Sequence, residues 1–217
     1  MPGRSTSSRP AGERFRSSFP TRTRSSCASI SSGTSRFSVP GSKYPFGLSS
    51  EASAWLRLPS RGASEAVPPG VHTGNLDNKE LTAGSTLYIP VHVKEALLFI
   101  GDGHAAQGDG EVNGTALEAS LSGKLQLVVR KDLKLRWPRA ETPQHYMTMG
   151  LDPDLDVAAE MAVSQMVDHL VQERGLSRED AYVLCSAAVD LRVTQVVDGT
   201  KGIHALLPKN IFVGGGR

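Results

Sequence analysis

Residues 152–207 read DPDLDVAAEMAVSQMVDHLVQERGLSREDAYVLCSAAVDLRVTQVVDGTKGIHALL, and this stretch decides the fold class. After Asp152, apolar side chains recur at helical spacing along one face. Gly175 then supplies the residue type that ends helices in the left-handed conformation. The sequence therefore predicts one long amphipathic helix, whose apolar face comprises Leu155, Ala159, Ala162, Met166 and Leu170.

A second helix and a pair of strands follow this helix. Ser177 stands three residues before Asp180, a spacing typical of a helix cap, and the helix is expected to continue past Cys185. Residues 191–197 and 202–207 are apolar and β-branched, and the turn-rich segment between them favours two short strands. Cys185 is most simply a small buried apolar residue.

Strand patterns dominate the chain upstream of the helices. Segments 86–93, 96–100 and 125–129 are β-branched or alternate between apolar and polar residues, and Gly, Asp and Asn separate them. The alternation around 125–129 predicts a strand with one solvated and one buried face. We expect a mainly β domain with appended helices, an α+β class, over residues 66–217.

A glycine-rich run, GDGHAAQGDGE at residues 101–111, directly follows one of these apolar strands. Its glycines permit close backbone approach, and Asp102, His104, Asp109 and Glu111 supply carboxylate and imidazole groups. No Gly-Lys-Ser/Thr follows, the spacing is not that of an EF-hand, and no Gly-x-Ser-x-Gly appears in the chain. A nucleotide loop of the Walker type, an EF-hand and a serine-hydrolase elbow are therefore excluded.

A second polar segment, HTGNLDNK at residues 72–79, precedes another strand. If both segments converge, they could hold a metal that turns water into a nucleophile near neutral pH. The alternative is a hydrogen-bond network that only shapes the loops. The other four histidines, His92, His145, His169 and His204, lack a carboxylate-rich neighbourhood in sequence and are expected to be structural.

The first 65 residues differ in composition from the rest of the chain. They carry a formal charge of +7 against −5 for the remainder, and residues 1–60 contain 17 Ser and 8 Arg. This composition cannot build a core, so residues 1–65 are expected to be a disordered leader. A transit-like segment and a basic arm are both compatible with it.

Four segments of the sequence resemble the acetamidase/formamidase family, namely residues 71–93, 101–118, 139–150 and 198–212. The resemblance covers about residues 66–212. It implies a β-sandwich with appended helices that forms homo-oligomers and hydrolyses short linear amides, such as formamide or acetamide, to carboxylate and ammonia. It also implies a divalent metal, with zinc favoured over calcium because the ligand set includes imidazole.

The resemblance assigns expected roles to the two polar segments. Asp77, Asp102 and His104 are expected at the metal, and Glu111 is the expected general base, with His104 as its catalytic partner. Asn75 and Gln107 are the expected amide-recognising donors, so the substrate-binding set is Asn75 and Gln107. Asp109, which lies between two glycines, is expected to be structural.

One departure from the family concerns the region before the first polar segment. Family members carry a long β-rich segment there. Residues 43–59 can be back-translated with permitted codons and then translated again from the third base, which gives VPLRPLFGGVGVAPP. This sequence resembles the end of the family's β-rich segment. Much of residues 1–60 is therefore hypothesised to be an out-of-frame translation. Without those strands the domain would be partial, and the activity of this chain would be in doubt.

A rival hypothesis is a non-catalytic metal-binding domain, or a regulatory protein, carried by the basic arm. Neither reading requires nucleic acid or a membrane, because the chain lacks aromatic-interleaved basic blocks and any run of roughly 18 apolar residues. Cys27 and Cys185 cannot form a disulfide framework, and a cytoplasmic location is the expected default.

Overall fold

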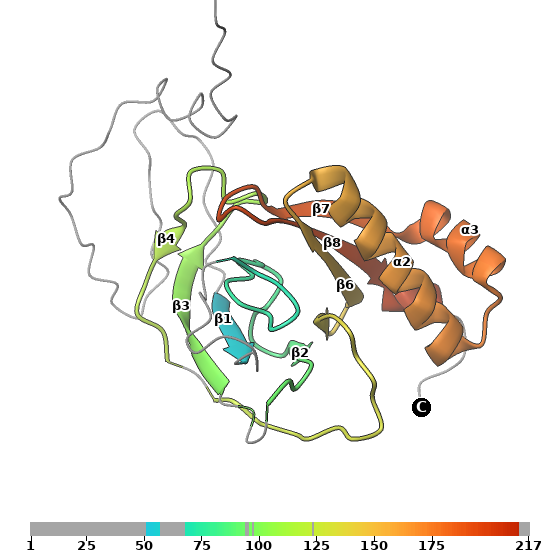
Figure 1. The fold of residues 1–217 in the computed structure, drawn as a ribbon, viewed down its shortest axis with the longest axis horizontal. Coiled ribbons are helices and arrows are strands. Elements are labelled where there is room, and N and C mark those ends of the chain that lie inside the picture. The colour runs from blue at the N-terminus through green and yellow to red at the C-terminus, as the bar shows by residue number, and fades with distance from the viewer. Residues whose placement is uncertain (1–50, 57–67, 94–95, 97, 123, 213–217) are drawn as a thin grey trace, which may run out of the picture. The chain divides into compact units, whose positions relative to one another are not determined.

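The computed structural model describes residues 51–56, 68–93, 96, 98–122 and 124–212, which all belong to one unit spanning 47–217. Within them lie two β-sheets and two α-helices (Figure 1). The predicted class, mainly β with appended helices, is confirmed. The elements in chain order are β1 (Glu51–Leu56), β2 (Thr86–Tyr88), β3 (Leu98–Ala106), β4 (Leu117–Glu118), β5 (Arg139–Glu141), β6 (His145–Asp152), α2 (Leu155–Arg174), α3 (Arg178–Ala188), β7 (Asp190–Gln195), β8 (Lys201–Pro208) and the 3-10 turn Lys209–Ile211.

The larger sheet has five strands in the order β2-β5-β6-β8-β7, and every neighbouring pair is antiparallel. Its central pair, β6 and β8, stays in register from His145 opposite Pro208 to Asp152 opposite Lys201. β8 is buried along six consecutive residues, because one face meets the helices and the other meets a second apolar cluster. That second cluster contains Leu76, Leu81, Ala140, Met147, Met149, Leu151 and Leu206.

Helices α2 and α3 lie side by side and α2 covers one face of the sheet at β6 and β8 (Figure 1). Their ends follow the sequence signals: Asp154 caps α2, Gly175 ends it at φ 66°, and Ser177 caps α3. Of the predicted apolar face of α2, Ala162, Met166 and Leu170 are buried and Leu155 and Ala159 are half-buried, while Ala158, which was not predicted, is completely buried. Cys185 is buried in this helix–sheet core, as predicted.

A close approach of backbone to backbone fixes α2 on the sheet. Gly150 of β6 lies so near the helix that an added Cβ would stand 1.8 Å from the Ala158 carbonyl oxygen and 2.7 Å from the Ala162 nitrogen. Beside it, the Thr148 hydroxyl donates a 2.7 Å hydrogen bond to the Ala162 carbonyl. Only glycine fits at position 150, so this residue sets the distance between the helix and the sheet.

The smaller sheet has three strands in the order β1-β3-β4. β3 continues from Leu98 through Ala106, so the first half of the glycine-rich run is strand and not loop, contrary to the sequence-based expectation. Hydrogen-bonded neighbours on both sides stabilise it, since β1 and β4 each pair with β3. As a consequence, Asp102 and His104 are placed by a strand and lie two residues apart on the same face.

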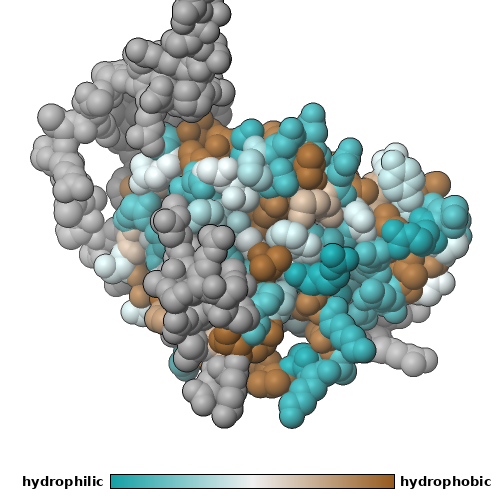
Figure 2. Space-filling model, viewed as in Figure 1, coloured by the Kyte–Doolittle hydropathy of each residue, from teal (hydrophilic) through white to brown (hydrophobic). Residues whose placement is uncertain are grey.

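Residues 125–129 were predicted to form a strand, and this prediction is wrong for the described structure. They have no regular secondary structure, and Leu125, Leu127, Val128 and Val129 are each exposed by two thirds or more. A strand needs a hydrogen-bonded neighbour, and none of the described strands pairs with this segment. On the face shown in Figure 2, exposed apolar and polar residues are intermixed.

The expected leader, residues 1–65, lies outside the described residues except for β1. Residues 51–56, which the composition assigned to the leader, form this strand and pair with β3. The hypothesis about the reading frame of residues 1–60 stays untested. Among the described residues, no helix is both long enough and apolar enough to cross a membrane.

Candidate active site

Four segments supply a cluster of acidic and imidazole side chains. The loop before β2 provides Asp77, β3 provides Asp102 and His104, the loop after β3 provides Glu111, and the β7–β8 turn provides Asp198. Asp77, His104 and Glu111 are buried, with exposed fractions of 2, 2 and 7%. The two polar segments that the sequence singled out therefore do converge.

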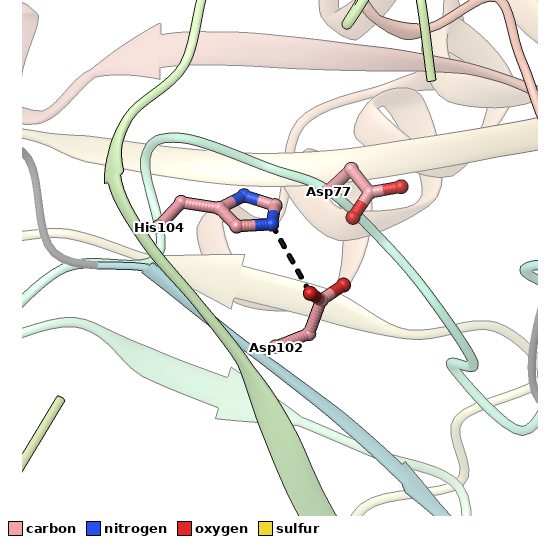
Figure 3. A group of neighbouring side chains, drawn as sticks. All are labelled: Asp77, Asp102 and His104. Atoms are coloured by element: carbon pink, nitrogen blue, oxygen red, sulfur yellow. Dashed lines mark hydrogen bonds and ion pairs between the residues drawn. The ribbon is translucent and has the colours of Figure 1, made fainter. Parts of the chain in front are cut away.

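Asp77, Asp102 and His104 form one group of potential ligands, with one atom of each within 4.8 Å of the others (Figure 3). In Figure 3, Asp102 and His104 come from the same strand and the Asp77 side chain reaches them from a neighbouring loop. His104 Nε2 lies 3.3 Å from Asp102 Oδ1 and 3.3 Å from Glu118 Oε2. An imidazole nitrogen between two carboxylates is a favourable ligand set for a divalent cation.

The tautomer of His104 follows from the bonds of Gln107. The Gln107 amide nitrogen donates to the Asp77 carbonyl, so its Oε1 is the atom that lies 2.8 Å from His104 Nδ1. Because Oε1 can only accept, Nδ1 carries the hydrogen and Nε2 presents a lone pair in the neutral ring. A lone pair facing two carboxylates repels them, so this arrangement is favourable only with a proton or a cation between the three groups.

The two oxygens of Asp77 have different environments. Oδ2 accepts hydrogen bonds from Asn75 Nδ2 at 2.9 Å and from Gln195 Nε2 at 3.0 Å. Oδ1 is fully buried and accepts no hydrogen bond from an amide, hydroxyl or ring donor among the described residues, while the Asp77 carboxyl shares a hydrogen bond with the Glu111 carboxyl. A buried carboxylate oxygen without such a donor is costly, and a bound cation would relieve that cost.

A second group of potential ligands shares Asp77 with the first, and comprises Asp77, Glu111 and Asp198. Burial raises the pKa of Asp77 to about 9, and the adjacent Glu111 carboxylate adds to the rise. Burial also raises the pKa of Glu111. Carboxylates packed this closely cannot all be ionised without compensating positive charge. The cluster is therefore expected to bind protons or cations.

The backbone is strained at the same positions. Of the six described non-glycine residues with positive φ, five are Thr73, Asp77, Asp102, Glu111 and Asp198, at φ angles between 39° and 79°. Side chains other than glycine adopt this region at a cost of about 1 kcal/mol each, and such residues gather at functional sites. Four of the five carry the carboxylates of the cluster.

A model of the Acetamidase/Formamidase family matches residues 46–213 of this sequence. The chain belongs to this family. The match begins about twenty residues before the resemblance found from the sequence words. The family membership that those words indicated is thus confirmed.

Known amidases are similar to this chain over part of their length. The formamidase of Methylophilus methylotrophus is 44% identical in an alignment of 172 residues that covers 69% of this chain and 42% of that protein. The acetamidase of Mycolicibacterium smegmatis is 43% identical over 58 residues, 27% of this chain and 14% of that protein.

Two solved structures are similar in fold. The acetamidase of Bacillus halodurans aligns with a TM-score of 0.73 and 35% identity, over 80% of this chain and 58% of that one. The acetamidase of Yersinia enterocolitica aligns with a TM-score of 0.68 and 30% identity, over 77% and 50%. This chain thus spans about half the length of the amidases that it matches.

The two amides expected to bind substrate are engaged within the cluster. Asn75 Nδ2 donates to Asp77 Oδ2 and, at 3.4 Å, to Asp198 Oδ2. Gln107 links His104 to the Asp77 backbone. These contacts favour a positioning role for both residues in this acetamidase/formamidase chain.

Asp109 behaves as expected for a residue outside the cluster, since it forms a 2.9 Å ion pair with Lys79. His169 accepts from Arg139, His204 bonds Thr194 and His92 bonds the Val71 carbonyl, which agrees with structural roles. His72 is buried beside the cluster segment.

Sequence reasoning missed three residues of the site: Asp198, Glu118 and Gln195. Asp198 lies in the segment DGTKG, which was interpreted as a turn and as the start of a family-like segment but was given no role in the site; its position directly after an apolar strand was the available signal. Gln195 carries no such signal, because a glutamine at the end of a strand is usually a surface residue. It is here completely buried.

Proposed function

We propose that this chain carries the catalytic cluster of a hydrolase that converts short linear amides, such as formamide and acetamide, to carboxylate and ammonia. The observation that carries the proposal is the convergence of Asp102, at the surface, with the buried Asp77, His104 and Glu111 in one cluster of a family member. The names of the similar proteins, formamidase and acetamidase, support the substrate class.

Asp77, Asp102 and His104 are the residues that would hold a divalent cation. Asp77 Oδ1, which accepts from no amide, hydroxyl or ring donor among the described residues, and the His104 lone pair fit such an ion, and the nitrogen ligand favours zinc over calcium. When bound, this cation would polarise the amide carbonyl and acidify water. The carboxylates and imidazole then need no further proton to relieve their repulsion.

Glu111 would act as the general base. It would accept a proton from the attacking water as the new carbon–oxygen bond forms, and later deliver that proton to the departing nitrogen. The carbon–nitrogen bond then breaks, and the products are ammonia and a carboxylic acid, which ionises to the carboxylate. A buried glutamate whose pKa is raised suits this role, because the raised pKa makes its carboxylate a stronger base.

His104 would contribute as the ligand and catalytic partner that Gln107 orients. The 2.8 Å contact between His104 Nδ1 and Gln107 Oε1 keeps Nε2 directed to Asp102. Orienting partners of this kind commonly set the tautomer and basicity of a ligating histidine. Asn75 would hold the Asp77 carboxylate in the same way.

The test is ammonia release from formamide and acetamide by the full chain with Zn²⁺. Glu111→Gln is expected to lower the rate at least about 100-fold, since a positioned base contributes that much or more. Asp109→Asn is the matched control, because Asp109 lies in the same glycine-rich run but forms an ion pair with Lys79 outside the proposed metal group. Equal rates for Glu111→Gln and wild type would contradict the proposal.

A second candidate function is a metal-binding domain without catalysis. The observation that favours it is the group Asp77, Asp102 and His104, which could hold a cation without the help of Glu111. Zn²⁺ binding without ammonia release would decide for this alternative. We retain a homo-oligomeric assembly and a cytoplasmic location as further proposals from the sequence.

A further inference from the structure

Gln195 contacts two segments of the acidic cluster through a single amide group, the loop before β2 and the β7–β8 turn. It lies at the end of β7 and is completely buried. Its Nε2 lies 3.0 Å from the Asn75 carbonyl, 3.0 Å from Asp77 Oδ2 and 3.2 Å from Asp198 Oδ2. Residues 120 positions apart in the sequence are thus held by one amide group.

The orientation of this amide is determined by its surroundings. Three oxygen acceptors surround Nε2, so a flipped amide would place Oε1 against three oxygens and lose every bond. Nε2 has two hydrogens to share among the three acceptors, and Oε1 has no partner among the described residues. The side chain is therefore locked with its donors on the cluster.

The backbone around Gln195 ties the glycine-rich segment to the same point. Gly110 donates to the Thr194 carbonyl at 3.2 Å and accepts from the Val196 nitrogen at 2.9 Å, which makes a parallel bridge across Gln195. Gly110 precedes Glu111 directly. Gln195 accordingly connects the segments of Asp77, Glu111 and Asp198.

The chemistry of a glutamine suits this position. The neighbouring carboxylates of Asp77 and Asp198 need donors, but a Lys or Arg would neutralise them and compete with a bound cation. An amide supplies donors without charge. By occupying Asp77 Oδ2, it also leaves Oδ1 as the oxygen available to a cation.

We propose that Gln195 is a positioning residue that fixes the Asp77 carboxylate so that Oδ1 alone is presented to a divalent cation, while holding Asn75 and Asp198 around it. This inference rests on the proposed metal-assisted function, but it concerns cation binding and can be tested without a substrate. Loss of such an outer contact typically lowers metal affinity 10- to 100-fold.

The experiment titrates Zn²⁺ into the metal-free full chain by calorimetry, for wild type, Gln195→Met and Gln195→Asn. Met keeps the size and removes the donors, whereas Asn keeps the amide but is one methylene shorter. Both are expected to bind Zn²⁺ 10- to 100-fold more weakly. Gln165→Met is the matched control, because Gln165 on α2 donates to the Met149 backbone, outside the cluster. Its Zn²⁺ affinity should equal that of wild type.

A double-variant cycle separates positioning from a general effect on the fold. Asp77→Asn alone should weaken Zn²⁺ binding, and adding Gln195→Met to it should cause no further loss, because Gln195 acts through Asp77. The proposal is overturned by wild-type affinity in Gln195→Met, by losses that multiply in the double variant, or by a wild-type chain that does not bind Zn²⁺. Failure of both Gln195 variants to fold would assign the residue to the fold and also overturn it.

The outcome does not depend on amide hydrolysis. If wild type binds Zn²⁺ but releases no ammonia, the proposed function fails while the Gln195 titration still gives its answer. If ammonia is released and Gln195→Met binds Zn²⁺ normally, the function stands and the inference about Gln195 fails.

Discussion

The packing of α2 on the five-stranded sheet can be tested by the substitution Gly150→Ala, which adds a single Cβ. In Gly150→Ala the new Cβ would stand 1.8 Å from the Ala158 carbonyl oxygen, where ordinary contacts begin at 3.4 Å. The helix and the sheet must therefore separate by about 1.6 Å, because both sides of the contact are backbone and no rotamer change can relieve it.

The cost of that separation follows from the residues that line it. Ala158, Ala162 and Met166 are completely buried at this interface. A gap of 0.5–1 Å already removes about a quarter to a half of the dispersion energy of a contact. We expect a loss of about 3–5 kcal/mol in the free energy of unfolding, at or above the usual range for overpacking.

Urea and thermal unfolding of the full chain, followed by far-UV circular dichroism, would measure this loss. For a domain of this size it corresponds to a fall in Tm of about 6–20 °C. Gly101→Ala is the matched control, because its Cβ would meet no atom within 4 Å, and a change of no more than about 1 kcal/mol is expected. A Gly150→Ala chain that melts within about 2 °C of wild type would refute the packing argument.

Two further predictions concern pH and metal. Burial, with the Arg139 charge, lowers the pKa of His169 from 6.5 to about 4. Between these two pH values the unfolded chain binds a proton at His169 that the folded chain does not bind. The stability present above pH 6.5 is therefore lost as the pH falls towards 4, at up to about 1.4 kcal/mol per pH unit. His169→Gln should flatten this part of the stability curve in urea titrations, and an unchanged slope would show that His169 is not responsible. Zn²⁺ at 100 times its Kd should raise the free energy of unfolding by about 2.7 kcal/mol, and EDTA should reverse the gain. Asp77→Asn should stabilise the metal-free chain and reduce the stabilisation by Zn²⁺ at a given concentration; an undiminished Zn²⁺ response in Asp77→Asn would exclude Asp77 as a ligand.

The helical part of the fold could be predicted from the sequence because its signals are local. Asp154, Gly175 and Ser177 act within a few residues of the helix ends that they define. The strand predicted at 125–129 failed for the opposite reason: alternation shows that a segment can be a strand, but pairing depends on residues far away. The same lack of information hid the extension of β3 into the glycine-rich run.

Part of the candidate site could be predicted from the sequence, and part could not. Asp102 and His104 were found because chemistry-bearing residues two apart in a glycine-rich word stand out, and Asp77 because its segment is similarly polar. Asp198 and Gln195 were missed because their proximity to Asp77 arises from the five-stranded sheet, which brings the β7–β8 turn back to a loop about 120 residues earlier.

The left-handed backbone at Asp77, Asp102, Glu111 and Asp198 has a consequence for how such a chain changes over evolutionary time. Glycine at any of these positions would release about 1 kcal/mol of strain, and at the buried positions 77 and 111 the removal of the carboxylate would release more. Selection for folding alone would therefore erase these four residues first. Their joint presence records selection for something other than folding, and in a duplicate gene freed from that selection the cluster would be the first part to decay.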